Sequence, residues 1–375
     1  MRTETTDFDL HGIVGIRLLN GTASDIAAVK KQLGPIQKPL SRPPDIVIRF
    51  VERMTFSSPV RYIGVDDAGF TDDAFLVFRG QHKRRVSVQI PFDQIGSPQC
   101  EIVCESGSGA VPLLIAILNM TALSRGALPL HASALRYNGK GIIVTGWAKG
   151  GKTETLMAFV ANGAEYIGDE WVYLSGDGQK MYGIPEPTRV WYWHLQQMPH
   201  YKALVKRGDL TRLQVLNGLV RLMDGLDSSR LGRGGSAPVR FARSLKALLK
   251  QQLNVQIPPE KLFGGKPGDG TVQPEKIFWV ASHAEPDLVV KKIDPREIAK
   301  RIVFSLQEER MGFLSYYYKY RFAFPECSNP LIDQSEEIQR ILLLKVFAET
   351  DAYAVYHPYP FSIPALFETI RPYCA

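Results

Sequence analysis

LHASALRYNGKGIIVTGWAKGGKTETLMAFVANGAEYIGDEWVYL, residues 130–174, is the stretch that decides the fold. It begins with two runs typical of β-strands, Leu130–Arg136 and Gly141–Thr145. Between them stand Asn138 and Gly139, the strongest short-range sequence signal for a two-residue hairpin turn. The sequence therefore predicts an antiparallel hairpin at this point.

The residues after the second strand, GWAKGGKT from Gly146 to Thr153, match the phosphate-loop pattern G-x-x-x-x-G-K-[ST]. Glycines let backbone N–H groups turn towards phosphate oxygens, and the N-terminus of the following helix adds partial positive charge. Lys152 is expected to reach the β- and γ-phosphates and to act in catalysis, and the Thr153 hydroxyl to bind Mg²⁺. The residues expected to bind ATP are Gly146, Lys149, Gly150, Gly151, Lys152, Thr153 and Glu154.

The hairpin also gives His131 a place. Pairing the strands across the turn sets His131 directly opposite Gly146, the first glycine of the loop. This register predicts an imidazole at the mouth of the nucleotide site. The alternative is an ordinary histidine that satisfies its hydrogen bonds within a strand.

Two acids end the decisive stretch. Helical spacing over Lys152–Asn162 is followed by Gly163, a plausible helix stop, and by a short strand that runs into Asp169 and Glu170. Asp169 is a candidate Mg²⁺ ligand and Glu170 a candidate general base. Successive strand residues point to opposite sides, so both carboxylates reach one site only if the strand ends there. The alternative for both is a helix cap or surface acid.

This stretch resembles the core of the HPr kinase/phosphorylase family, whose P-loop fold is related to ATP-dependent phosphoenolpyruvate carboxykinase. The matching positions are His131, Gly151-Lys152-Thr153-Glu154 and Asp169-Glu170. The resemblance implies an α/β fold with a P-loop kinase core and a mixed sheet. It also implies Mg²⁺-ATP binding at Lys152, Thr153 and Asp169, and deprotonation of the acceptor hydroxyl by the second acid with the assistance of His131.

Three features depart from the family pattern. The second acid is Glu170 where the family has Asp, which lengthens the reach of the base. Trp147 and Lys149 stand where the family usually has small residues. The later signature that captures the protein substrate is not recognisable, so HPr is not the expected substrate.

The rest of the chain divides around this core. Residues 1–105 have short strand-like runs (Ile46–Val51, Phe75–Phe78, Val86–Ile90) and predict a β-rich N-terminal domain. Residues 106–375 are predicted to form the catalytic domain, with a buried helix over Val111–Leu123.

Further elements are predicted within residues 106–375. A basic helical insert spans about 196–261, interrupted by a loop over Asp224–Pro238. A strand pair, two helices, a strand and a terminal helix follow. The strand pair is predicted at Lys276–Val280 and Leu288–Lys292, and the two helices at Pro295–Leu306 and Ser335–Thr350. The later strand is predicted at Ala352–Tyr356.

The formal net charge of +7 is unevenly spread, because residues 201–250 alone carry 11 Lys and Arg against 3 Asp. This basic segment suggests an anionic partner, and a solvated helical face is the alternative. Four cysteines are too few for a disulfide scaffold. No signal peptide or membrane span is recognisable, which predicts a cytoplasmic protein without a membrane partner.

The favoured function is a kinase that transfers the γ-phosphoryl group of ATP to a hydroxyl, most simply Ser or Thr of a peptide or protein. A small-molecule acceptor, and a nucleotide-dependent regulator or ATPase, are the alternatives. Nucleic acid is disfavoured as a partner because no aromatic interleaving accompanies the charge. The oligomeric state is left open.

Overall fold

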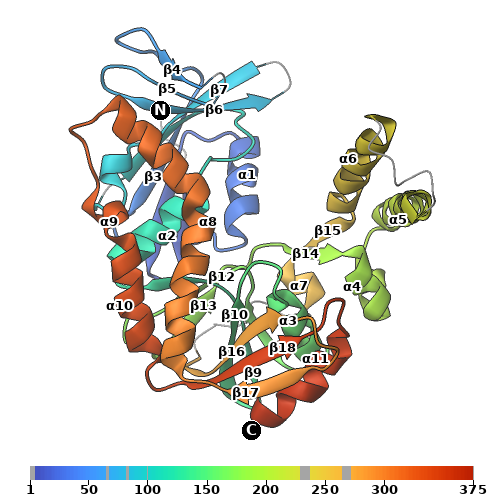
Figure 1. Ribbon diagram of the computed structural model, residues 1–375. Helices are drawn as coiled ribbons and strands as arrows, with labels where there is room; N and C mark the ends of the chain where they lie inside the picture. Colours follow the sequence, from blue (N-terminus) through green and yellow to red (C-terminus); the bar gives the residue numbers. More distant parts are fainter. Residues whose placement is uncertain are drawn as a thin grey trace.

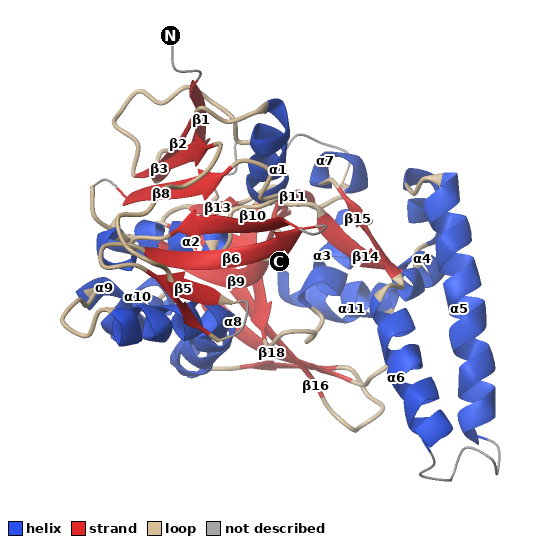
Figure 2. Cartoon of the chain, turned by 90° about the horizontal axis from the view of Figure 1, so that it is seen from above, coloured by secondary structure: helices blue, strands red, loops and turns tan. Residues whose placement is uncertain are grey.

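Two large β-sheets with helices around them form the computed structural model of the chain (Figure 1). The structure describes residues 5–64, 67–81, 84–98, 100–228, 237–263 and 272–374. One sheet comes from the first part of the chain, and the other contains the decisive stretch (Figure 2). The fold is therefore mixed α/β, as the sequence predicts at this coarse level.

The N-terminal sheet has eight strands in the order β1-β2-β3-β8-β7-β6-β5-β4. The central pairs β2–β3 and β3–β8 are parallel, and the other neighbouring pairs are antiparallel. Helix α1 (Ala23–Leu33) connects β2 to β3. The strands are β1 (Thr5–Leu10), β2 (Val14–Leu19), β3 (Ile46–Val51), β4 (Arg61–Ile63), β5 (Ala68–Phe70), β6 (Phe75–Gln81), β7 (Arg84–Gln89) and β8 (Cys100–Glu105).

The second sheet follows the order β13-β12-β9-β10-β16-β18-β17, with β11 also paired to β9. Only the pairs β10–β16 and β16–β18 are parallel. The strands are β9 (Leu128–Tyr137), β10 (Lys140–Gly146), β11 (Glu165–Gly168), β12 (Trp171–Leu174), β13 (Met181–Gly183), β16 (Pro274–Ser282), β17 (Val289–Lys292) and β18 (Asp351–His357).

The hairpin prediction is confirmed. Strands β9 and β10 pair antiparallel from Tyr137↔Lys140 to Ala132↔Thr145, and both turn residues have positive φ (51° for Asn138 and 81° for Gly139). Continued by one residue, this register sets His131 opposite Gly146, the last residue of β10.

Helices cover both faces of the second sheet. Alternate residues of β10 face opposite layers: Ile142 and Val144 pack with helices α3 (Lys152–Val160) and α11 (Ile363–Ile370). Ile143 packs on the other side, with α8 (Pro295–Ala323) and α10 (Ser335–Phe347). The remaining helices of this region are α2 (Leu114–Ser124), α4 (Tyr192–Gln197), α7 (Pro259–Leu262) and α9 (Pro330–Asp333).

The predicted strand pair after residue 275 needs a correction. Strands β16 and β17 both form, but they are not neighbours, because β18 lies between them. The apolar run of β16 instead pairs in parallel with β10 and β18, so that it is buried at the centre of the sheet. Helix α8 is also longer than predicted and continues to Ala323.

Helix α8 belongs to both halves of the molecule (Figure 1). Its first half, with Ile298 and Ile302, packs in the core beneath the second sheet. Its second half places Phe313, Tyr317 and Tyr320 in the core of the N-terminal sheet, which also takes in α2. The hydrophobic core of the N-terminal sheet therefore includes residues from both sides of position 105.

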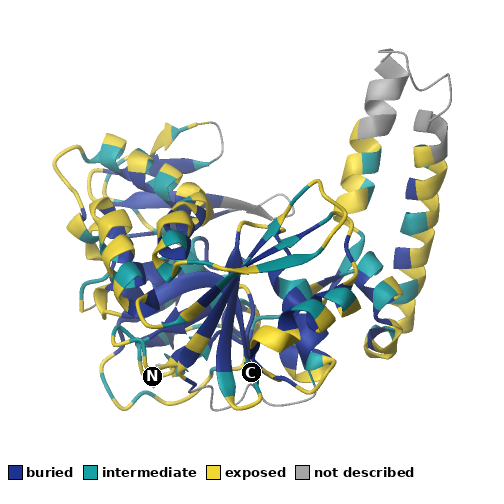
Figure 3. Ribbon diagram, turned by 60° about the horizontal axis from the view of Figure 1, so that its bottom comes forward, coloured by how far each residue is buried: buried dark blue, intermediate teal, exposed yellow. Residues whose placement is uncertain are grey.

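Two long helices, α5 (Arg207–Ser228) and α6 (Ala237–Gln251), extend away from the rest of the chain (Figure 3). Strands β14 (Thr188–Trp191) and β15 (Asn254–Ile257) pair at their base. The predicted loop over Asp224–Pro238 is too long, because α5 continues to Ser228 and α6 starts at Ala237. The residues between these helices lie outside the described part of the chain.

Candidate functional site

The predicted phosphate loop connects β10 to α3. Gly146 (φ 153°) and Gly151 (φ 103°) adopt backbone conformations that L-residues rarely take. Space is also limited, because a Cβ on Gly146 would lie 2.4 Å from the Val280 carbonyl oxygen and one on Gly151 2.9 Å from Nε2 of His357. Both positions therefore require glycine.

His357, at the end of β18, supports this loop from below. Its ring is fully buried, and Nε2 donates a hydrogen bond to the Gly150 carbonyl oxygen (2.8 Å). The bond links the loop to a strand two places away in the sheet. Sequence reasoning missed His357 because it is 207 residues away along the chain.

Lys152 begins α3 and is buried beneath the loop. Its ammonium donates hydrogen bonds to the carbonyl oxygens of Gly146 (3.2 Å) and Trp147 (3.1 Å). Burial lowers the pKa of Lys152, and the negative charges of Glu170 and Asp169 oppose that shift. The ammonium of Lys152 is therefore held under the loop, within the electrostatic influence of the two carboxylates.

Asp169 connects the acidic strand end to α3. Ser133 donates to Oδ1 of Asp169 (2.6 Å), and the Thr153 hydroxyl lies 3.2 Å from both carboxylate oxygens. Burial and the nearby charge of Glu170 raise the pKa of Asp169 to about 6. The two residues predicted to hold Mg²⁺ are therefore in direct contact.

Glu170 faces the same site because the strand ends before it. β11 stops at Gly168 and β12 starts at Trp171, and Glu170 has a left-handed φ of 64°. Nε2 of His131 donates to its Oε2 (3.1 Å), and this bond is the main reason that the pKa of Glu170 is lowered. The turn thus satisfies the condition under which both carboxylates reach one site.

His131 lies between two acids. Its Nε2 meets Glu170, and its Nδ1 is 2.7 Å from Oε1 of Glu309 on α8. Burial disfavours the charged ring, but the interactions with the two acids outweigh it, and the pKa of His131 is raised. The hydrogen bond to Glu170 and the ion pair with Glu309 both favour an imidazolium. Glu309 was missed because nothing in its local sequence distinguishes it.

Another acid, the half-buried Glu186, lies next to this group. Burial, with the negative charges of Glu170 and Asp169, raises the pKa of Glu186 to about 8. Within the described residues, Oε1 of Glu186 has no hydrogen-bond partner, and neither does the Tyr166 hydroxyl. Neither residue was predicted from the sequence.

The remaining predicted nucleotide ligands are placed differently. Oε1 of Glu154 is held by Nε2 of His194 (2.9 Å), which is itself 1% exposed. The carboxylate therefore faces α4 and supports the start of α3. Lys149 has a positive φ of 64° and an exposed side chain on the outer face of the loop.

The structure thus brings together five of the predicted catalytic and metal residues, namely His131, Lys152, Thr153, Asp169 and Glu170. The described residues hold no group of three or more His, Cys, Asp or Glu side chains that could bind a metal ion alone. Mg²⁺ in phosphate sites uses only one or two carboxylates beside the phosphate oxygens. The Thr153 and Asp169 oxygens fit that requirement.

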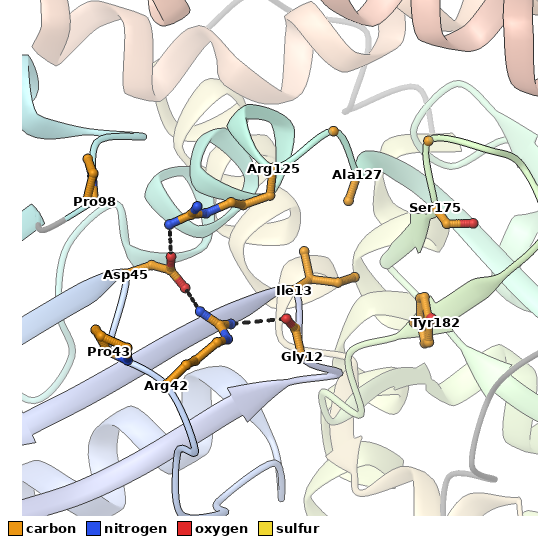
Figure 4. A pocket seen from close by; sticks show the side chains of 12 residues that line it. Gly12, Ile13, Arg42, Pro43, Asp45, Pro98, Arg125, Ala127, Ser175 and Tyr182 are labelled. Atoms are coloured by element: carbon orange, nitrogen blue, oxygen red, sulfur yellow. Dashed lines mark hydrogen bonds and ion pairs between the residues drawn. The ribbon is translucent and has the colours of Figure 1, made fainter.

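Two cavities lie near the second sheet. One, of about 490 Å³, borders the loop and is lined by Trp147, Gly150, Trp279 and Arg301 among others. The other, of about 620 Å³, lies between the N-terminal sheet and β13 (Figure 4). Its two arginines, Arg42 and Arg125, both pair with Asp45, so one carboxylate compensates only part of their charge.

The comparisons with known proteins add no family. The chain matches no protein-family model. A search of curated proteins finds no similar sequence. Within the described residues, no helix is both long and apolar enough to cross a membrane.

Proposed function

We propose that this protein is an ATP- and Mg²⁺-dependent kinase with a P-loop core of the HPr kinase type. The observation that carries the proposal is a cluster of ionisable side chains at the loop. The charges of Asp169 and Glu170 act on the buried Lys152, and the partly exposed Glu170 accepts a hydrogen bond from His131. Ionisable groups with shifted pKa values gather more often at active sites than elsewhere.

Each residue has a role that its environment supports. The loop amides and Lys152 would hold the phosphates of ATP. Thr153 and Asp169 would hold Mg²⁺, which neutralises charge on the transferring phosphoryl group. Ser133 fixes the orientation of the Asp169 carboxylate by its 2.6 Å hydrogen bond to Oδ1.

Glu170 is the proposed base. The acceptor oxygen forms a bond to the γ-phosphorus, the bond from that phosphorus to the β,γ-bridging oxygen breaks, and ADP leaves. Glu170, which is ionised before the step because its pKa is lowered, takes the acceptor proton and becomes neutral. In a loose phosphoryl-transfer transition state, correct position matters more than high basicity. His131 orients the carboxylate and lends positive charge.

The acceptor class is a hydroxyl of a peptide or protein, with a small molecule as the alternative. The test is a screen of Ser/Thr peptide libraries and polyols with Mg²⁺ and γ-labelled ATP. Wild type should label an acceptor, and Glu170→Gln should bind ATP but transfer phosphate about 100-fold or more slowly. Equal transfer by Glu170→Gln would place the base elsewhere.

A nucleotide-dependent regulator or ATPase is the second candidate. Helix α8 favours it, because the same helix carries Glu309 at the site and Phe313 in the N-terminal core. A change at the loop would thereby reach the N-terminal sheet. ATP hydrolysis without any labelled acceptor in the screen would support this candidate over the kinase.

A further inference from the structure

The cavity of about 490 Å³ beside the phosphate loop is made by three separate elements. Loop residues from Trp147 to Gly150 form one wall, the end of β16 from Trp279 to Ser282 forms another, and α8 from Arg301 to Ser305 forms the third. Its size is within the range of roughly 300–1,000 Å³ that small-molecule sites occupy.

Five of the twelve described residues that line the cavity carry aromatic or cationic side chains. The Arg301 guanidinium lies over the Trp279 ring, 5.1 Å from its centroid. Trp147 is 53% exposed and Phe304 59% exposed, so two further aromatic side chains at this cavity remain open to contact. Aromatic faces and guanidinium planes stack on nucleobases of any sequence, because each base has a π-face.

The cavity is continuous with the proposed phosphate site. Gly150 belongs both to the cavity wall and to the loop that would hold phosphates. Helix α8 borders both places as well, since Arg301 and Glu309 are separated by eight residues, or about 12 Å along the helix axis. A ligand with phosphates in the loop can therefore extend a flat group into this cavity.

The polar part of the lining favours adenine over guanine. Guanine presents N–H donors that a carboxylate accepts well. Among the described residues that line the cavity there is no Asp or Glu, whereas Ser282 and Ser305 supply hydroxyls that both donate and accept.

We propose that this cavity, defined by Trp147, Trp279, Arg301 and Phe304, is the nucleobase subsite, and that it stacks the adenine of ATP. The proposal rests on the proposed triphosphate binding at the loop. It also explains why the loop carries Trp147, a large residue exposed at the mouth of this cavity.

Calorimetric titration with two ligands, Mg²⁺-ATP and Mg²⁺-tripolyphosphate, separates base binding from phosphate binding. Trp279→Leu should weaken ATP binding by about 10- to 100-fold, since stacking of one base contributes that much. Phe304→Ala, at an exposed position that should not affect folding, should weaken it less. Both variants should bind tripolyphosphate within about twofold of wild type. Phe322→Ala, an aromatic position on the same helix that is 72% exposed and away from the cavity, is the control.

The outcomes are distinguishable. If both variants keep wild-type affinity for ATP, the base lies elsewhere and this inference is overturned, although the kinase proposal stands. If they lose ATP and tripolyphosphate equally, the cavity acts only on the loop and the inference is again overturned. If wild type binds neither ligand, both the proposed function and this inference are overturned.

Discussion

Neighbouring carboxyl groups in this site have pKa values shifted in opposite directions. Burial and the charge of Glu170 raise the pKa of Asp169 to about 6, whereas the hydrogen bond from His131 lowers that of Glu170. Groups driven apart in this way suit different tasks. Asp169 gains most from a nearby cation, and Glu170 is ionised at neutral pH without one.

Because the pKa of Asp169 is raised, its ionised carboxylate destabilises the folded protein. A carboxyl group whose pKa is higher in the folded state binds protons more tightly there, so stability is lost as pH rises from 3.8 to about 6. Asp169→Asn should therefore raise the free energy of unfolding at pH 8 by up to about 3 kcal/mol. The gain should shrink as pH falls below 6.

Thermal unfolding between pH 5 and 8, without nucleotide, measures this effect. Asp177→Asn is the matched control, because Asp177 is exposed and its pKa is lowered. A lower melting temperature for Asp169→Asn at pH 8 would contradict the assigned charge of this site. The same variant should weaken Mg²⁺-dependent ATP binding. That result would show that the destabilising charge of Asp169 is needed for binding.

Glu309 is expected to hold His131 in its charged form. Removing the carboxylate charge in Glu309→Gln should lower the pKa of His131, because the negative charge of Glu309 helps to raise that pKa. A pH titration of the His131 ring by NMR measures the shift. Glu308→Gln, at the exposed neighbouring position, is the control and should leave the ring unchanged. An unchanged pKa in Glu309→Gln would exclude this role.

The conformation of the phosphate loop also depends on the helix and strand that it contacts. Gly151 begins α3 at φ 103° against His357, whereas Gly163 follows the end of α3 at φ 91° in open space. Gly151→Ala adds both backbone strain and a clash, so it should weaken Mg²⁺-ATP binding at least about tenfold. Gly163→Ala carries similar backbone strain without the clash and should lower only stability.

ATP titration and thermal unfolding of both alanine variants test this contrast. If Gly151→Ala binds ATP as wild type does, the loop does not depend on its contact with His357. If both variants lose ATP affinity equally, the loss reflects strain in α3 rather than the local clash.

Short-range signals made much of this element order predictable. The Asn138-Gly139 turn fixed the register of β9 and β10, and hence the position of His131. The position of β18 between β16 and β17 was not predictable, because no local residue signals which strands become neighbours. Helix α1 was missed although Thr22 and Asp25 form a capping box, since its apolar pattern is weak.

Long-range contacts set the limit for the site itself. The phosphate-loop motif and the two acids lie in one short stretch of sequence, so their chemical roles could be predicted from it. Glu309, Glu186 and His357 come from distant elements and reach the site only through the sheet topology and helix α8. The contact of Glu154 with His194 was not predicted, because a local motif cannot show which distant side chain binds its carboxylate.

Residues from the second part of the chain complete the hydrophobic core of the N-terminal sheet. Helix α2 and the second half of α8 bury Ile117, Phe313 and Tyr317 against the N-terminal sheet. A truncated chain of residues 106–375 would expose this surface to water. It should therefore aggregate or melt well below the full chain.

Circular dichroism melting and size-exclusion chromatography of the truncated chain test this expectation. Adding residues 1–105 as a separate chain should restore a single cooperative transition. A monomeric truncated chain that melts at the full chain's temperature would show that residues 106–375 fold independently of the N-terminal sheet.

The central claim is that a triphosphate binds where Lys152 faces the two acids. Calorimetric titration of Mg²⁺-ATP into wild type and Lys152→Ala tests it most directly, with Lys180→Ala as an exposed control. Wild type and Lys180→Ala should bind alike, and Lys152→Ala should bind about 100-fold more weakly or not at all while remaining folded. Equal ATP affinity in all three proteins would contradict the account.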